Sequence, residues 1–499
     1  MKRLKGHTAN LTVLVTLVAL SLLIVGCSPS ERDSTTESQP GASKAAGVAV
    51  SEREAQLTYS RAFEAILWAS PALAVMAQVE AGQRDLGAGN HDIIYTSKSM
   101  DHRWGGITYN NQSPYWVAGF SVKDEPVVVD IPPARADARF FGSIHDVWFL
   151  PLEDFGPAGA DQGKGGKYLV LPPGYDGEVP EGYIVLQSGS YLHLIPGRTI
   201  PRDKGQKGWD AAVDYIQSLR IYPLSEAKSP RPTRFIDGAQ KEYRAQPMFD
   251  LSDFYLIDRL VQEEPIREHD KFMLGLLDGI GIRKGQKFDP SPEVAAILEK
   301  AAKDAQTSAI EHIKNGESFN PFWEGSAWGS FKVTPKVAAG LASYVFDDRI
   351  AHEDRIFNHF YFSGGMYKSF DATRPSSTAY MMTAKDGAGS GLDATKTYKI
   401  NVPANPPMKD FWSIIAYGTE SRTFINSPKF TVSSNDEGVK VNDDGSIDLY
   451  LGPKPVTGFE ANTVITNPDE DAFLMFRFYG ATPQLWERKW QLGDPELVN

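Results

Sequence analysis

The chain has 499 residues, more than one hydrophobic core usually holds, so we expect two or three domains. Its hydrophobic fraction of 41% is typical of a soluble globular protein, and its formal net charge at pH 7 is −12. General binding to nucleic acid or to anionic lipid needs a basic face, so this charge predicts no nucleic-acid partner. A local basic patch stays compatible with the net charge.

Residues 1–26 have the pattern of a bacterial signal peptide. Three basic residues lie within the first five positions, and residues 11–25 form an apolar run. The run is short for a membrane span but suits the apolar core of a signal peptide. It leads into Cys27 in the sequence Ile-Val-Gly-Cys, which resembles a lipobox, where the cysteine is acylated and becomes the first residue after cleavage. The alternative is an ordinary signal anchor in which the cysteine is incidental.

Cys27 is the only cysteine in the chain, so it is the predicted lipidation site and no intrachain disulfide can form. It is followed by Ser28 rather than by Asp, which by resemblance to Gram-negative sorting favours the outer membrane. We therefore expect a lipid-anchored protein of the bacterial cell envelope that faces the periplasm or the surface. Its predicted partner is the membrane, through Cys27. Residues 27–50 contain almost no large apolar side chain, which predicts a flexible tether.

Residues 51–222 are predicted to hold an N-terminal helix followed by a first β-module. Apolar residues at helical spacing predict the helix between 51 and 82, with Pro71 as a break or a kink. Residues 85–101 are polar and are predicted to form a loop. The β-module then extends from about 104 to 197 and is dense in Gly and Pro turns.

Residues 223–378 are predicted to form a helical region between two β-modules. The clearest helix is 292–314, which has a serine in front of it that suits the N-cap and a proline at its first position. Residues 379–499 are predicted to hold the second β-module and a tail, whose Trp486 and Trp490 we expect to pack back onto a domain. Apolar spacing predicts further helical segments at 209–219, 254–260, 269–277 and in part of 333–360.

The second β-module resembles the first. The stretch that begins at Tyr398 and the one that begins at Pro126 each have an alternating apolar run, a turn broken by proline and a second run opened by two aromatics. Downstream, 445–453 resembles 166–172, and 473–476 resembles 183–186. Period-2 alternation with β-branched and aromatic residues indicates strands, so we expect two related β-modules. Chance similarity between two β-rich regions is the alternative.

Several motifs make the chain resemble a known pair of bacterial domains. Three segments resemble the domain of unknown function twelve fifty-four: NNQSPY at 110–115, PVVVDIP at 126–132 and GGKYLVLPP at 165–173. Three further segments resemble its usual C-terminal companion, the domain of unknown function twelve fourteen. They are residues 399–417, 444–446 and 477–480. The resemblance covers most of the chain after the tether.

This resemblance implies an α+β fold, with two antiparallel β-sandwich, jelly-roll-like modules joined by the helical region. It implies a secreted or envelope location but no established reaction, and the cofactor stays unknown. At one place the chain departs from the pattern, because it has Asn462-Thr463 where the C-terminal domain commonly has Asn-Trp. If that tryptophan lines a site in relatives, the site is altered here.

Standard catalytic motifs are absent from the sequence. There is no Gly-x-Ser-x-Gly elbow and no Walker A loop, and a single cysteine rules out Cys-x-x-Cys. His352 and His359 are seven residues apart, about 10 Å along a helix, which is too far for one metal ion, and we predict no metal site. Glu353 and Arg355 suit an ion-pair network, and the functional alternative is Glu353 as an acid/base group in a cleft.

His145 and Asp146 are the candidate catalytic pair of the first module, because the second module has the apolar Ile415-Ala416 at the same point. With Glu353 they form our predicted set of general acid/base residues. A buried structural histidine is the alternative. Neighbouring side chains of a strand point to opposite faces, so His145 and Asp146 are not automatically a dyad.

A second set of residues is predicted to bind a ligand. Amide and phenol groups suited to a hydroxyl-rich ligand come from Asn110, Asn111, Gln112 and Tyr115. Arg198 and Arg477 end comparable strands of the two modules, where they either anchor a carboxylate or bind backbone carbonyls and loop acids. Turns rich in Asn are common before strands, so a structural role for the amides is the alternative.

Three functions stay open at this point. The first is a hydrolase or lyase that acts by general acid/base catalysis on a small or glycan-like ligand in a cleft. The second is a non-catalytic envelope module that binds such a ligand, and the third is an assembly module that associates through its sheets. The sequence leaves the reaction, the substrate and the oligomeric state undecided.

Overall fold

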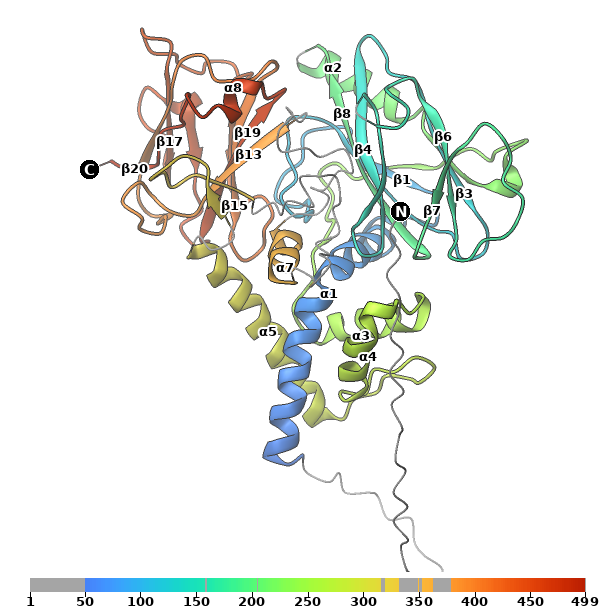
Figure 1. The fold of residues 1–499 in the computed structure, drawn as a ribbon. Helices are drawn as coiled ribbons and strands as arrows, with labels where there is room; N and C mark the ends of the chain where they lie inside the picture. The colour runs from blue at the N-terminus through green and yellow to red at the C-terminus, as the bar shows by residue number, and fades with distance from the viewer. Residues whose placement is uncertain are drawn as a thin grey trace, which may run out of the picture. The chain divides into compact units, whose positions relative to one another are not determined.

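The structure is a computed structural model that describes residues 50–498, except for 158, 204, 316–318, 332–348, 350–351 and 362–377. The predicted signal peptide, Cys27 and nearly all of the predicted tether lie outside the described residues. Val50–Asn499 form one compact unit. Its helices and strands are labelled along the chain in Figure 1.

A long helix, α1 (Glu52–Leu86), begins the described chain. The Ser51 hydroxyl accepts a hydrogen bond from the backbone N–H of Glu54, and the Glu54 carboxylate accepts one from the backbone N–H of Ser51. Pro71 lies inside α1 and does not end it. By length and composition α1 could cross a membrane, but 78% of its most apolar window is buried inside the protein, as in a core helix.

The described helices that pack against α1 are α3 (Leu251–Glu263), α4 (Lys271–Asp278), α5 (Pro292–Lys314) and α7 (His352–Tyr361). α5 has the bounds that the sequence predicts, and the Ser291 hydroxyl accepts from the backbone N–H of Val294 at 3.3 Å. α5 runs beside α1 (Figure 1), and its buried face carries four alanines. Short 3₁₀ turns lie at Leu224–Glu226, Glu268–Asp270 and Glu460–Asn462.

The first β-module is a six-stranded sheet packed on a four-stranded sheet. The larger sheet has the order β10 (Phe235–Asp237), β1 (Ile93–Tyr95), β2 (Tyr115–Ser121), β8 (Leu192–Pro201), β4 (Ala138–Asp146), β5 (Pro151–Phe155). The smaller has the order β7 (Ile184–Gln187), β6 (Gly166–Leu171), β3 (Val127–Ile131), β9 (Arg220–Pro223). Side chains from both sheets and from α2 (Gly205–Ile216) fill one core around Trp116.

The second β-module repeats this arrangement. Its larger sheet has the order β11 (Phe319–Pro321), β12 (Gly329–Phe331), β13 (Thr378–Thr383), β19 (Ala472–Tyr479), β15 (Trp412–Gly418), β16 (Thr431–Ser433). Its smaller sheet has the order β18 (Thr463–Ile465), β17 (Ile447–Gly452), β14 (Tyr398–Val402), β20 (Glu496–Leu497). A short helix, α8 (Pro483–Trp486), follows β19.

The two modules share one strand order, which confirms the predicted repeat. In the larger sheets β2-β8-β4-β5 corresponds to β13-β19-β15-β16, and in the smaller sheets β7-β6-β3 corresponds to β18-β17-β14. The outer pairs β6–β7 and β17–β18 are both parallel. One predicted match was wrong: the run at 183–186 forms β7, the counterpart of β18, whereas 473–476 lie in β19, the counterpart of β8.

The sequence did not indicate four short strands at or next to the edges of the larger sheets. The predicted loop at 85–101 contains β1, and the predicted helical region supplies β10, β11 and β12. A strand of three residues is too short to show a period-2 pattern. The tail packs back as predicted, since the indole N–H of Trp490 lies 3.3 Å from the carbonyls of both Pro403 and Ala404.

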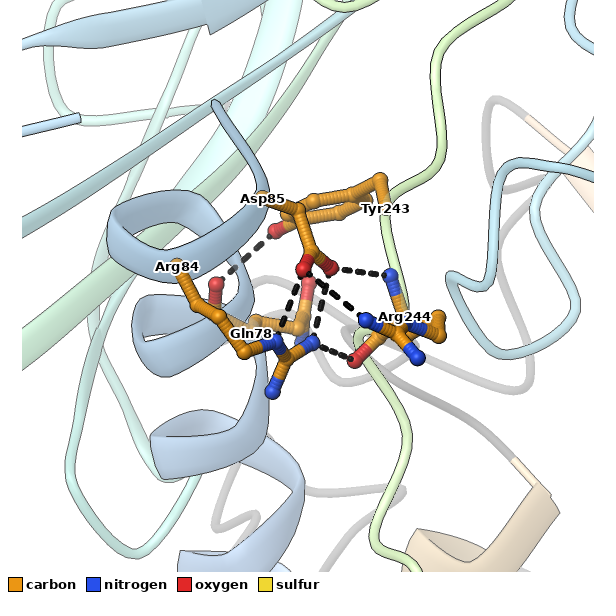
Figure 2. A network of polar contacts seen from close by, with 5 residues as sticks. All are labelled: Gln78, Arg84, Asp85, Tyr243 and Arg244. Atoms are coloured by element: carbon orange, nitrogen blue, oxygen red, sulfur yellow. Dashed lines mark hydrogen bonds and ion pairs between the residues drawn. The ribbon is translucent and has the colours of Figure 1, made fainter. Parts of the chain in front are cut away.

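A polar network holds the segment around Tyr243 against the end of α1 (Figure 2). The Asp85 carboxylate accepts from the Arg84 guanidinium at 2.7 Å and from the backbone N–H of Arg244 at 2.9 Å. The Tyr243 hydroxyl donates to the Gln78 carbonyl at 3.1 Å. The Arg84 contact holds the pKa of Asp85 below its ordinary value. This network is structural, because each group in it has a partner from the protein.

Candidate functional site

Arg198 lies on β8 between Tyr115 of β2 and Phe141 of β4, its partners in the two neighbouring strands. Its guanidinium carbon lies 5.1 Å from the centre of the Tyr115 ring and 4.9 Å from that of Phe141. The residue is only 7% exposed. A buried guanidinium therefore lies on the larger sheet of the first module, between two aromatic rings.

Arg477 occupies the same position in the second module. It lies on β19 between Tyr380 of β13 and Ser413 of β15. Its guanidinium carbon lies 5.5 Å from the ring centre of Tyr380 and 5.6 Å from that of Tyr417. The residue is 2% exposed. Tyr380 thus corresponds to Tyr115 by its place in the ladder.

Each arginine donates to the other module. Arg198 donates to the hydroxyls of Thr378 at 3.3 Å and Tyr380 at 3.4 Å. Arg477 donates to the carbonyls of Thr108 at 2.5 Å and Tyr109 at 3.2 Å, just before β2. These crossing bonds bring the two sheets together around one polar cluster. We call Arg198, Arg477, Tyr115, Tyr380 and Asn110 the arginine–tyrosine junction.

Asn110 joins the junction through its amide. The Nδ2 group donates to the Tyr115 hydroxyl oxygen at 3.1 Å, and Oδ1 accepts from the backbone N–H of Gln112 at 2.7 Å. The Gln112 side chain turns away and donates to Asn111 Oδ1 at 3.0 Å. Of the six predicted ligand-binding residues, the structure gathers Asn110, Tyr115, Arg198 and Arg477 and leaves Asn111 and Gln112 in the adjoining turn.

The two equivalent phenols differ electrostatically. Burial raises the pKa of Tyr115 to about 12, although both arginines oppose the rise. Burial also acts against ionisation of Tyr380, but there the charges of Arg198 and Arg477 outweigh it, so the pKa of Tyr380 lies below its ordinary value. Both guanidinium groups therefore act on the same pair of phenols.

His145 and Asp146 end β4, away from Phe141. The His145 ring stacks on Phe149 with ring centres 4.8 Å apart. Asp146 Oδ1 accepts from the backbone N–H groups of Trp148 and Leu150, both at 2.9 Å, so it holds a turn. Burial raises the pKa of Asp146 to about 6. By its ladder partner His145 corresponds to Tyr417 of the second module, and the predicted match to Ile415-Ala416 was off by a short shift.

Glu353 does not join His145 and Asp146 at a common position. It is exposed on α7, whereas both other groups are buried. His359 on the same helix is buried, with its Nδ1 2.7 Å from the Arg355 carbonyl, and its ring meets Phe149 edge-on. Among the residues that the structure describes, no three His, Cys, Asp or Glu side chains gather in a way that could hold a metal ion.

A separate pocket of about 360 Å³ lies where α1 and α3 meet the edge of β2 and β8. Its lining mixes apolar and polar side chains and includes Arg259, which lies 3.8 Å from the Glu263 carboxylate. None of the predicted site residues lines it. The pocket lacks a cluster of buried charged groups, which the junction has.

The sequence did not indicate Tyr380 of the junction or Thr378, which accepts a hydrogen bond from Arg198. Local composition does not mark them, because they lie in an ordinary apolar strand. The repeat does contain a signal. Thr-Ala-Tyr at 378–380 parallels Ser-Pro-Tyr at 113–115, and each tripeptide ends at the tyrosine that is the ladder partner of an arginine. Extending the repeat backwards by one strand would have found them.

Asn462, at the departure from the domain pattern, has a structural role here. Its Nδ2 donates to the carbonyls of Lys440 and Asp448, both at 2.9 Å, and its Oδ1 accepts from the backbone N–H of Lys440 at 2.8 Å. It is fully buried on the smaller sheet's side of the second module. Neither Lys440 nor Asp448 belongs to the junction.

Comparison with known proteins confirms the resemblance to both domains, in the predicted order. Residues 103–223 match the family described as protein of unknown function (DUF1254), and residues 377–483 match protein of unknown function (DUF1214). No curated protein matches the chain.

Among solved structures, the VPA0106 protein from Vibrio parahaemolyticus is similar, with a TM-score of 0.52 and 17% identity over 89% of this chain and 100% of that one. An uncharacterized protein from Burkholderia cenocepacia has a TM-score of 0.38 and 12% identity over 90% of this chain and 96% of that one. The first likeness supports the mixed α+β fold.

Proposed function

We propose that this chain, in which a DUF1254 domain precedes a DUF1214 domain, binds a small or glycan-like acid at the arginine–tyrosine junction. In this proposal the protein is lipid-anchored through Cys27 to the cell envelope, in the outer membrane. The pattern of residues 1–28 supports the location, and the chemistry of the junction supports the ligand.

The hydrogen bonds of Arg198 are the observation that supports acid binding at the junction. Two of its hydrogen bonds go to the hydroxyls of Thr378 and Tyr380 at 3.3 and 3.4 Å, the long end of the hydrogen-bond range. Arg477 instead bonds to backbone carbonyls, one of them at 2.5 Å, and so serves to hold the modules. A carboxylate can replace weak hydroxyl contacts with a charge-assisted fork, which is about twice as strong as a neutral bond. Arg198 is therefore our candidate anchor for the carboxylate.

The groups around Arg198 suit a sugar acid. Tyr115 and Asn110 supply a phenol and an amide for hydroxyl groups. Tyr380 approaches the same guanidinium from the second module, so a bound acid would contact both modules. A neutral sugar could use the amide and phenols but not the charge of Arg198.

Thermal-shift measurements on the detergent-purified full chain test this proposal. Galacturonate and glucuronate should raise the melting temperature, whereas galactose and glucose should have little effect. In Arg198→Gln the rise should disappear, because the charge is lost. In Arg139→Gln it should persist, because Arg139 pairs with Asp410 at 3.1 Å outside the junction. Equal shifts from acids and neutral sugars would refute the acid-binding site.

A further inference from the structure

We propose that Tyr380 and Tyr115 act as a base and an acid that carry out β-elimination on a uronate held by Arg198. This inference rests on the proposed function, because the carboxylate must first bind at the junction. It replaces His145, Asp146 and Glu353 as the acid/base groups, which the fold does not bring to one position.

The phenols of Tyr115 and Tyr380 both lie beside the guanidinium of Arg198. Tyr115 lies directly opposite Arg198 in the β2–β8 ladder, with its ring 5.1 Å from the guanidinium carbon. Tyr380 comes from β13 of the other module, and its hydroxyl lies 3.4 Å from Arg198 Nη2. A carboxylate on Arg198 would therefore have a phenol from each module beside it.

The pKa values of these two phenols are shifted in opposite directions, which suits one to act as an acid and the other as a base. The ionised form of Tyr380 is favoured by Arg198 and Arg477, while Tyr115 keeps its proton, with a pKa of about 12. Tyr479 and Tyr417 also face the cluster, and burial raises the pKa of each. Two titratable groups whose environments push their pKa values apart are the pattern of an acid and a base.

The reaction balances without any further reactant. Arg198 neutralises the uronate carboxylate, which acidifies the hydrogen on the adjacent carbon. The Tyr380 phenolate takes that proton, a carbon–carbon double bond forms, and the bond from the β-carbon to the glycosidic oxygen breaks. Tyr115 gives its proton to the leaving oxygen. A proton then passes from Tyr380 to Tyr115, and no water or oxidant is consumed.

Asn110 acts as a positioning residue in this scheme. Its amide donates to the Tyr115 oxygen at 3.1 Å, which fixes the phenol and stabilises its charge once the proton has left. Arg477 acts through its charge, because its Nη groups are engaged with the carbonyls of Thr108 and Tyr109.

The test uses the detergent-purified full chain with 4-linked oligogalacturonate. The unsaturated product absorbs in the ultraviolet, and its mass shows cleavage without added water. Tyr380→Phe and Tyr115→Phe should each lower kcat by about 10²- to 10⁴-fold while oligomer affinity changes little. Tyr255→Phe, at an exposed phenol on α3, is the matched control and should keep the wild-type rate. The wild-type rate should rise with pH as Tyr380 ionises.

The outcomes separate the two proposals. If the oligomer binds but no unsaturated product forms, the elimination is disproved and acid binding stands. If the oligomer does not bind, both proposals fall. A Tyr380→Phe variant that turns over at the wild-type rate removes Tyr380 as the base. Ultraviolet titration of phenolate gives a substrate-free check: Tyr380→Phe should lose the first buried phenol to ionise, and identical titrations would overturn the assignment.

Discussion

Arg198 and Arg477 occupy the same ladder position in two separate six-stranded sheets, and each donates hydrogen bonds into the other module. The two arginines differ in the groups to which they donate these hydrogen bonds. Arg198 meets side-chain hydroxyls, whereas Arg477 meets backbone carbonyls. We infer that the two equivalent positions serve different tasks, with Arg477 joining the modules and Arg198 binding the carboxylate of a ligand.

Replacing Arg477 with Lys should destabilise the protein. Lysine cannot reproduce the fork to the carbonyls of Thr108 and Tyr109, and two buried acceptors would lose partners. We expect a loss of about 1–3 kcal/mol in the free energy of unfolding, measured by urea denaturation. Arg139→Gln breaks a part-exposed ion pair and should cost less than about 1 kcal/mol. Equal losses in the two variants would argue against a joining role for Arg477.

Replacing Gly197 with Ala should disturb the first core. Gly197 lies opposite Trp116, and a Cβ atom there would come within 2.0 Å of the indole ring. Since Trp116 is fully buried, we expect a destabilisation of about 2–3 kcal/mol in urea denaturation. Gly189→Ala is the control, because an added Cβ there meets nothing within 4 Å. A stable Gly197→Ala variant would mean that the indole can repack.

The sequence was sufficient for features with a strong local pattern. The helix at 292–314 was predicted to the residue, because a serine cap, an N-terminal proline and a clear apolar period agree. The repeated modules were also found, since their strands alternate. Edge strands such as β11 were missed because three residues show no period and are selected by their neighbours in the sheet.

The candidate site was only partly predictable for a different reason. Arg198, Arg477 and Tyr115 stand out by residue type, but their meeting depends on how two modules pack, which no local pattern records. No local sequence pattern distinguishes Tyr380 from the other residues of its strand. The same limit explains the prediction about Glu353, which was grouped with His145 on chemistry, whereas α7 leaves it exposed.

Asp146 should give the protein a pH-dependent stability. Burial raises its pKa from 3.8 to about 6, so the folded protein holds this proton more tightly than the unfolded chain. The cost of the buried charge is present above about pH 6 and falls away as the pH drops toward 3.8. Lowering the pH from 7 to 5 should therefore stabilise the wild type by about 1 kcal/mol through this group.

The Asp146→Asn variant isolates that effect. Asparagine still accepts hydrogen bonds from the Trp148 and Leu150 N–H groups but takes up no proton. Its unfolding free energy, measured in urea at both pH values, should lack the gain of about 1 kcal/mol. If both proteins respond alike to pH, Asp146 is already ionised at pH 5.

We expect acylation of Cys27 to anchor the protein in the outer membrane. In Cys27→Ser the acylated thiol is lost, so a fatty-acid alkyne that labels the wild type in growing bacteria should not label the variant. Membrane fractionation should move the variant out of the outer-membrane fraction. Labelling of Cys27→Ser, or its retention in that fraction, would contradict lipid anchoring through Cys27.

Calorimetric titration of galacturonate into the wild type and into Arg198→Gln measures whether Arg198 binds the acid. We expect saturable binding by the wild type and an affinity about 10- to 100-fold weaker in the variant, because a charge-assisted bond is lost. Arg139→Gln should bind as the wild type does. Equal affinity of Arg198→Gln and wild type, or no heat of binding from either, would show that the arginine–tyrosine junction only joins the two modules.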